Sequence, residues 1–230
     1  MSKITWDESG KRFYHSGVSK AVVYPISDAG TYPKGYGWTG ITGIDENPEG
    51  AEPNEIYADN ILYAILRSAE KYGVSISAFN YPDEFLPCDG VKEVTPGMYV
   101  RQQNRQAFGL CWRTEIGNDV GSYADDGYIL HVAYGLTVSP SDQTHDTINE
   151  NPDAGEFSWD ADGMPVKMAG YKPTYTLEFD SRTLPAAAMT AVENVLYGTD
   201  GVEGGEGTEA RLPLPDELLQ IVKTANGVTP

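Results

Sequence analysis

Basic residues are scarce in this chain. Lys and Arg together supply 16 of the 230 residues, against 34 Asp and Glu, and the formal net charge is −18. No segment carries the block of positive charge that would neutralise a row of phosphates or hold an anionic membrane surface. An acidic surface repels nucleic acid. The composition therefore disfavours a DNA-binding, RNA-binding or membrane-anchored protein.

Cysteine is also rare, and long apolar runs are missing. The two cysteines, Cys88 and Cys111, do not make a disulfide framework, and Cys111 lies inside an apolar alternation that is typical of a small buried thiol. Residues 1–17 contain no apolar run of the kind that secretion signals use, and no window approaches a membrane span. We expect a protein that is made in a reducing cytoplasm, is not exported by a signal of its own and has no membrane partner.

The three histidines are too few for a rich metal site. Asp142, His145 and Asp146 lie close together in sequence, but their spacing matches no fixed metal motif, and a solvated loop is the simpler interpretation. The stretch DADG at 160–163 begins like a calcium loop, yet its twelfth position is Tyr171, where a bidentate Glu is needed. We interpret this stretch as a turn and expect no metal and no cofactor.

Motifs of catalysis are missing as well. The chain has no serine-centred elbow, no phosphate-binding glycine loop and no Walker-type lysine. Carboxylate pairs such as Asp83–Glu84 and Asp125–Asp126 arise by chance in so acidic a chain, and acid–base catalysis needs two groups at a fixed separation. His131 falls in the middle of a predicted strand, opposite its apolar face, which favours a structural or interface histidine. We expect a protein that is not an enzyme, with no catalytic residue.

Alternation of apolar and polar residues dominates what is present, and it predicts strands. In GYILHVAYGLTV one face carries Tyr128, Leu130, Val132, Tyr134, Leu136 and Val138. In AFGLCWRTEI, Phe108, Leu110, Trp112 and Ile116 share a face opposite Arg113 and Glu115. Helical signals occur at 185–197, between Pro185 and Gly198, and in a short C-terminal segment that starts at Pro215, and PDEFLPCDG at 82–90 is expected to add one further turn between strands. The sequence predicts a mainly β fold, a β-sandwich or barrel with one packed α-helix and a short C-terminal helix.

The chain shows no internal repeat and no second core. We expect a flexible N-terminal arm over 1–17, a single β-sandwich domain over 18–224, and a flexible C-terminal tail over 225–230. Within the domain, the glycine-rich and acidic stretch 198–210 is expected to be a mobile loop.

A long hairpin is predicted within residues 57–80. Two apolar-rich runs flank the polar stretch RSAEKYG at 67–73, which we take as the turn. The predicted hairpin has one mixed, polar face, with its Ile, Leu and Val side chains turned toward the core. The candidate residues of the polar face are Tyr57, Asp59, Tyr63, Ser75, Ser77 and Phe79.

Several longer strings occur in a telling order: YADNILY, YPDEFLPCDG, FGLCWRTEIGND, HVAYGLTVSPSD, GYKPTYTLEFDS, and LYGTDG followed by RLPLPDEL. As a set they resemble the major tail protein of long-tailed bacteriophages and prophages with non-contractile tails, the subunit of the tail tube. The resemblance runs from about Gly35 to Leu219. The stretch VEGGEG after GTDG is longer than the family pattern suggests.

The resemblance implies a β-sandwich with a packed helix that forms hexameric rings, which stack into a hollow tube. Each subunit adds strands to a shared inner barrel through which genomic DNA passes without specific binding. Implied partners are further copies of the chain, the tape-measure protein, the tail-tip initiator and the tail terminator, and the implied location is the virion. The predicted hairpin would then line the lumen or join subunits, because a barrel closed by several chains leaves no free sheet edge.

Three alternatives stay open. The chain could be a related ring-forming protein, such as a tail terminator or a secretion-tube protein. It could be a carbohydrate-binding β-sandwich that uses aromatic side chains, for instance Trp38 or Trp159, against sugar rings. The hairpin could also simply close a monomeric sandwich.

Overall fold

The computed structural model describes residues 4–50, 52–121, 126–141, 143–145, 147, 154–201 and 206–227. Its elements are, in chain order, β1 (Phe13–Pro25), β2 (Tyr36–Trp38), β3 (Ile41–Gly50), β4 (Pro53–Ala58), β5 (Ile61–Arg67), β6 (Glu70–Ala78), the 3₁₀ helix η1 (Asp83–Phe85), β7 (Lys92–Thr95), β8 (Met98–Val100), β9 (Phe108–Asn118), β10 (Gly127–Val138), β11 (Phe157–Asp162), β12 (Thr176–Asp180), α1 (Ala186–Tyr197) and α2 (Pro215–Ala225).

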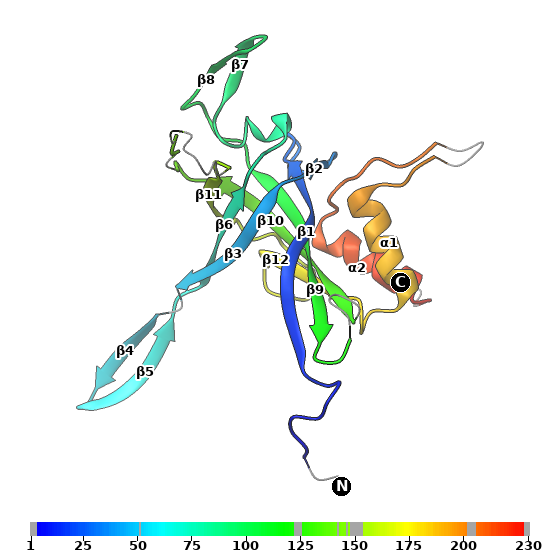
Figure 1. The fold of residues 1–230 in the computed structure, drawn as a ribbon. Coiled ribbons are helices and arrows are strands. Elements are labelled where there is room, and N and C mark those ends of the chain that lie inside the picture. The colour runs from blue at the N-terminus through cyan, green and yellow to red at the C-terminus, as the bar shows by residue number, and fades with distance from the viewer. Residues whose placement is uncertain are drawn as a thin grey trace.

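Antiparallel pairing joins most strands into one sheet that folds over on itself (Figure 1). The strand order is β2-β1-β9-β10-β11-β6-β3, and β12 also pairs with β10. Residues 129–133 of β10 pair with β12, whereas Thr137 and Val138 pair with β11. Strand β10 therefore belongs to both layers of a sandwich, and the mainly β fold predicted from the alternation is confirmed.

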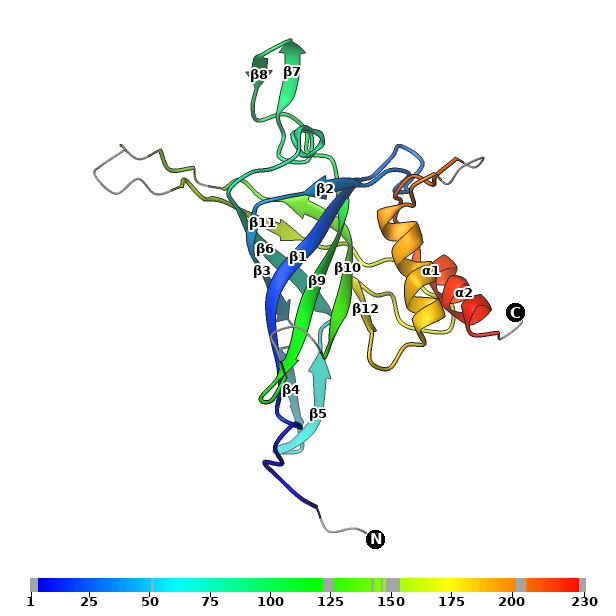
Figure 2. The same cartoon turned by 45° about the vertical axis from the view of Figure 1, so that its right-hand side comes forward.

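Two cores lie on the two sides of the β1-β9-β10 layer. The first fills the space between the layers and is rich in aromatic side chains, among them Trp38, Phe85, Phe108, Trp112 and Trp159. The second lies between the other face of that layer and the two helices, where Tyr24 and Tyr134 pack with Val192, Leu196 and Leu218. Figure 2 shows α1 and α2 together on this side of the sheet. The chain thus stacks sheet, sheet and helices.

Gly135 makes β10 change faces. The register of β10 against β9 shifts between Ala133 and Leu136, and Gly135 has a φ of 62°. As a result, Leu130, Val132 and Tyr134 enter the helix-side core, but Leu136 and Val138 enter the core between the sheets. The prediction that all six apolar residues share one face is therefore wrong for Leu136 and Val138, because a bulge inserts one residue into the alternation.

The helices follow their sequence signals. Helix α1 begins after Pro185 and ends before Gly198, whose φ of 78° suits glycine. It buries Ala188, Met189, Val192 and Leu196. Helix α2 has Pro215 in its first turn, as predicted. None of the helices in the described part of the chain is long and apolar enough to cross a membrane.

The ends and loops differ in places from the expectations. Strand β1 starts at Phe13, which pairs with Asn118, so residues 13–17 of the expected arm belong to the sheet. Within the loop 198–210, Thr199 and Thr208 form a bridge, while residues 202–205 lie outside the described part. Residues 228–230 of the expected tail also lie outside it.

The structure bears on one of the two stretches weighed as metal sites. Asp160 and Asp162 are residues of β11, where they pair with Ser75 and Gly73, so they are not part of a calcium loop. Of the candidate set Asp142, His145 and Asp146, the two aspartates lie outside the described residues.

We predict that Gly135→Ala destabilises the fold by about 2–4 kcal/mol, since an Ala there adopts a left-handed conformation. Its Cβ would also lie 2.6 Å from the Met164 carbonyl oxygen. Urea unfolding of the variant measures the loss. Gly37→Ala is the control, because its Cβ would meet nothing within 4 Å, and it should cost about 0.5 kcal/mol or less. Equal stabilities of the two variants would contradict the role of the bulge.

Both cysteines are buried and free, as expected for Cys111. Burial raises the pKa of Cys88 and of Cys111 to about 12. At pH 8 only about one thiol in ten thousand would then be ionised, and the thiolate is the reactive form. We predict that a thiol-specific colorimetric reagent labels neither cysteine in the folded protein at pH 8 and both after guanidinium unfolding. Fast labelling of the native protein would contradict the packing around these thiols.

Candidate functional site

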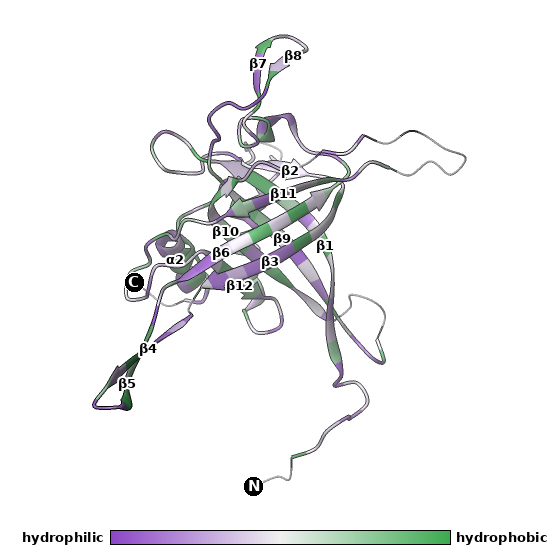
Figure 3. Cartoon of the chain, turned by 90° about the vertical axis from the view of Figure 1, so that its left-hand side faces the viewer, coloured by the Kyte–Doolittle hydropathy of each residue, from purple (hydrophilic) through white to green (hydrophobic). Residues whose placement is uncertain are grey.

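The most unusual surface feature is a two-stranded ribbon that leaves the sandwich. Strands β3 and β6 pair as far as Gly50 and Glu70, and β4 and β5 then pair from Pro53 and Arg67 outward. The distal half, β4–β5, stands free of the body (Figures 1 and 3). Residues 41–50 and 52–78 therefore form one long ribbon, in which β3–β6 is the inner half and β4–β5 the outer half.

The turn of this ribbon lies at Asp59 and Asn60. Both residues have positive φ, 52° and 61°, as a tight hairpin turn of type I′ requires. The prediction of a turn at 67–73 is wrong, because Arg67 ends β5, Glu70 begins β6, and these two strands do not pair with each other. Asp and Asn tolerate the left-handed region better than other non-glycine residues, and that was the missed signal.

Strand β5 exposes apolar side chains along its whole length. The exposed fractions are Ile61 63%, Leu62 45%, Tyr63 73%, Ile65 50% and Leu66 55%. Figure 3 shows the hydrophobic colour concentrated at this end of the ribbon. The prediction that the Ile and Leu residues turn toward the core is thus wrong for β5. It is confirmed for β6, where Val74 and Ile76 are buried.

The two halves of the ribbon present different edges. The outer edge of β3 carries Asp45, Glu46, Pro48 and Glu49, and charge and proline are the usual means of blocking unwanted strand pairing. Strand β5 has the sequence ILYAILR, with no acid and no proline, and among the described residues it pairs only with β4. An exposed apolar strand with a free edge favours association with another chain.

The predicted polar face divides between these halves. Tyr57, Asp59 and Tyr63 lie on the distal β4–β5 ribbon, where the Tyr57 hydroxyl donates to Glu55 Oε2 at 2.7 Å. Ser75 and Ser77 lie on β6 within the sandwich layer, and Phe79 follows them with 50% exposure. The structure therefore does not bring the six residues together, although Ser75, Ser77 and Phe79 share the side of β6 opposite its buried residues, as predicted.

The outer face of the β3-β6-β11 layer is acidic. Ser75 is paired with Asp45 on one side and Asp160 on the other, and residues that pair directly share a face. By the same register, Glu49 and Asp162 also lie on this face. Lys71, which pairs with Glu49, is the one basic residue among these paired positions. The Ser75 hydroxyl donates to Asp160 Oδ1 at 2.6 Å and accepts from Asn47. This wall is polar and predominantly negative.

A second hairpin, β7–β8, was not predicted. It follows η1 and projects from the end of the molecule opposite to β4–β5 (Figures 1 and 2). Val94, Met98 and Tyr99 are 60%, 56% and 48% exposed on it. Its strands are short, and Pro96–Gly97 at the turn was the available sequence signal. The molecule therefore carries an exposed apolar hairpin at each end.

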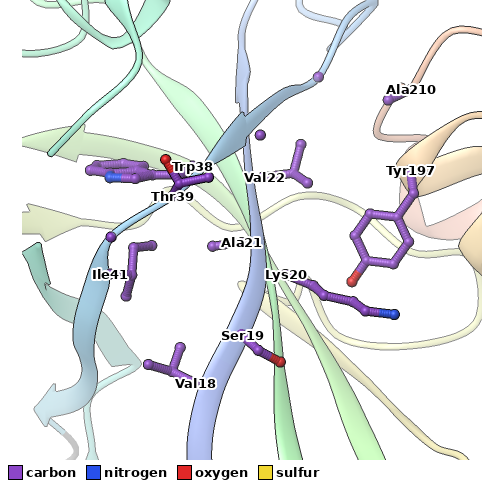
Figure 4. Close-up of a pocket in the computed structure, with 13 residues that line it drawn as sticks. Val18, Ser19, Lys20, Ala21, Val22, Trp38, Thr39, Ile41, Tyr197 and Ala210 are labelled. Atoms are coloured by element: carbon purple, nitrogen blue, oxygen red, sulfur yellow. The ribbon is translucent and has the colours of Figure 1, made fainter.

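A groove of about 710 Å³ runs beside β1 and β2 (Figure 4). The only ionisable side chains in its lining are Lys20 and Tyr197, and burial raises the pKa of Tyr197 well above its ordinary value. The other lining residues are small or apolar, such as Ala21 and Ile41. The groove thus holds no pair of groups suited to proton transfer near neutral pH.

No protein-family model matches the chain, and no curated protein matches it.

We predict that the distal ribbon is dispensable for folding. Replacing residues 51–69 by Asn-Gly would join Gly50 to Glu70 through a two-residue hairpin turn. None of the residues 53–67 contributes to either core, so the melting temperature should change by no more than about 4 °C, the equivalent of about 1 kcal/mol in a chain of this size.

Ile76→Ala tests the sensitivity of that measurement. Ile76 is fully buried on β6, and its truncation should cost about 2–5 kcal/mol. If removing the ribbon destabilised the fold as much as Ile76→Ala, the ribbon would be part of the folding unit.

Proposed function

We propose that the protein is a structural subunit that associates with copies of itself, and that the assembly is the tube of a bacteriophage tail, a stack of hexameric rings. The observation that carries the proposal is β5, an exposed apolar strand with a free edge on a projecting ribbon. An isolated two-stranded ribbon is marginally stable in water, so this one is expected to gain its full order from a partner.

A second copy of the chain is the partner that fits best. A closed ring gives each ribbon a neighbour on both sides and leaves no strand edge exposed, which an open pairing with a single foreign chain does not do. The apolar side chains point to both faces of the ribbon, as burial between neighbouring subunits requires. The resemblance to tail tube subunits supports the same arrangement.

The hairpins at opposite ends of the molecule support stacking. A ring built from head-to-tail contacts needs two different surfaces that meet each other, and repetition of such contacts extends a tube. The β4–β5 and β7–β8 hairpins offer two such surfaces, each with exposed apolar residues. We propose that the β4–β5 ribbon closes each ring through the edge of β5 and also meets β7–β8 of the next ring, and that the tail-tip initiator and the tail terminator bind the hairpins left free at the two ends of the tube.

The acidic face is the proposed lumen wall. Six copies of a chain of charge −18 would bring −108 to one ring, and the outer face of β3-β6-β11 places Asp45 and Asp160 on the two sides of Ser75. A negative wall does not bind phosphates, so genomic DNA would slide along it without having to break protein–phosphate contacts. Before DNA enters, the tape-measure protein would fill this lumen. The protein would act in the virion after synthesis in the host cytoplasm, without catalysis.

The two tryptophans named for the carbohydrate-binding alternative are buried. Trp38 is 4% exposed and Trp159 is 1% exposed, and both lie in the core between the sheets. Neither ring can stack on a sugar. A related ring-forming protein, such as a tail terminator, stays a second candidate, because it would use the same exposed ribbon but would form rings without extending them.

We predict that the purified full chain self-associates on concentration into rings or tubes, seen by negative-stain electron microscopy and by mass in light scattering. The double variant Ile65→Ser/Leu66→Ser should weaken each contact by about 2 kcal/mol, or about 30-fold in dissociation constant. Met164→Ser is the matched control, because Met164 is 71% exposed and belongs to neither hairpin. A closed dimer, or assembly unaffected by the double variant, would refute the proposal; single rings without tubes would favour the terminator.

A further inference from the structure

A second polar cluster lies at the rim of the space between the two layers of the sandwich. It has no part in the proposed assembly surfaces. Glu46 of β3, His131 of β10 and Glu178 of β12 each offer one ligand atom, and these three atoms lie within 4.8 Å of one another. Residues 46, 131 and 178 are far apart in sequence, so no motif predicts the cluster. His131 and Glu178 belong to one layer of the sandwich, and Glu46 belongs to the other.

Strand register explains why the three side chains converge. His131 pairs directly with Glu178, so the two share a face, and that face is the one on which Ala133 enters the core between the layers. Glu46 pairs with Val74, which is buried in the same core, so Glu46 also points inward. Its neighbour Asp45 faces the opposite way, toward the acidic outer wall.

The imidazole of His131 is held with one nitrogen facing the carboxylates. Nε2 lies 2.9 Å from Thr114 Oγ1, and the ring stacks on Trp112 with centroids 5.1 Å apart. Nδ1 lies 3.4 Å from Glu178 Oε1 but is buried without a hydrogen-bond partner among the described residues. When Nε2–H donates to Thr114, Nδ1 therefore turns a lone pair toward carboxylate oxygens, an arrangement that a cation between them stabilises.

The spacing of the ligand atoms matches that of zinc ligands. Two ligands on a tetrahedral zinc ion, each at about 2.0–2.1 Å, lie about 3.4 Å apart. The distance between His131 Nδ1 and Glu178 Oε1 already has this value.

The surrounding groups orient the ligands. The Tyr72 hydroxyl donates to Glu46 Oε1 at 2.6 Å, and Thr114 and Trp112 fix the plane of the imidazole. Hydrogen bonds of this kind to metal ligands hold the ligand atoms in place and tune their basicity. An acidic cluster formed by chance on a surface would not carry an aromatic stack and two oriented hydrogen bonds.

We propose that Glu46, His131 and Glu178 form a binding site for Zn²⁺, with three protein ligands and the remaining position open to water. One imidazole and two carboxylates suit zinc better than Ca²⁺ or Mg²⁺, which take oxygen ligands alone. Bound zinc would join the two layers at the strand that continues into the ribbon. The proposal does not depend on the role of the protein in assembly.

The test uses the full chain stripped with a chelator and titrated with ZnCl₂ in a calorimeter, with thermal unfolding followed in parallel. We expect one zinc ion per chain, a higher melting temperature with zinc, and little effect of MgCl₂ or CaCl₂. His131→Gln, Glu178→Gln and Glu46→Gln should each weaken binding by about 10-fold or more, and Tyr72→Phe by about 10-fold. Since Glu46 and Glu178 are exposed at the surface, their variants should fold even if His131→Gln does not.

Asp45→Asn is the matched control, because it removes the same charge from the adjacent position on the other face of β3. It should bind zinc as the wild type does. The absence of zinc binding by the wild type would overturn the proposal. So would binding that Asp45→Asn weakens as much as Glu46→Gln does, or binding that survives in Glu46→Gln and Glu178→Gln, since both would point to general attraction of cations to an acidic surface.

Discussion

The pairing of β10 with strands of both layers is the constraint on which the rest of the structure depends. Its first half pairs with β9 and β12 and covers the helix-side core. Its last two residues pair with β11, and Leu136 and Val138 enter the core between the sheets. One glycine in the left-handed conformation makes this change possible. Without the bulge, Leu136 and Val138 would face the helices, and the second layer would lose both its connection to the first and part of its core.

That second layer in turn supports the ribbon. Strand β6 buries Val74 and Ile76 and exposes Ser75 and Ser77, so the inner half of the ribbon is held by a core on one side and solvated on the other. The outer half has no such core, and its apolar side chains stay exposed. The contrast between the two halves is the physical basis for the proposed separation of folding from association: no residue of β4–β5 belongs to either core, and its exposed apolar side chains would be buried only by a partner.

The sequence predicted those elements whose local signals, such as helix-capping residues, act in the same direction as the packing around them. Pro185 and Gly198 bound α1 because their backbone preferences hold in any context. The face change in β10 could not be predicted, since both faces of that strand are buried and the apolar pattern continues through Gly135. The predicted turn of the ribbon is misplaced for a related reason. Ile61 to Leu66 have the apolar pattern of core residues, so the expected turn falls at the next polar stretch. The cluster of Glu46, His131 and Glu178 depends on the register of three strands, which no local pattern contains.

Charge and apolar exposure act against each other in this molecule. A net charge of −18 keeps separate copies apart over roughly a Debye length, about 10 Å at 0.1 M salt, whereas the contacts of β5 act only when side chains touch. In the proposed assembly, repulsion therefore opposes the encounter of two chains, and burial of the ribbon stabilises the contact once it forms. Acids and a proline lie along β3, whereas β5 has neither, so the exposed edge that favours pairing is the one on the distal ribbon.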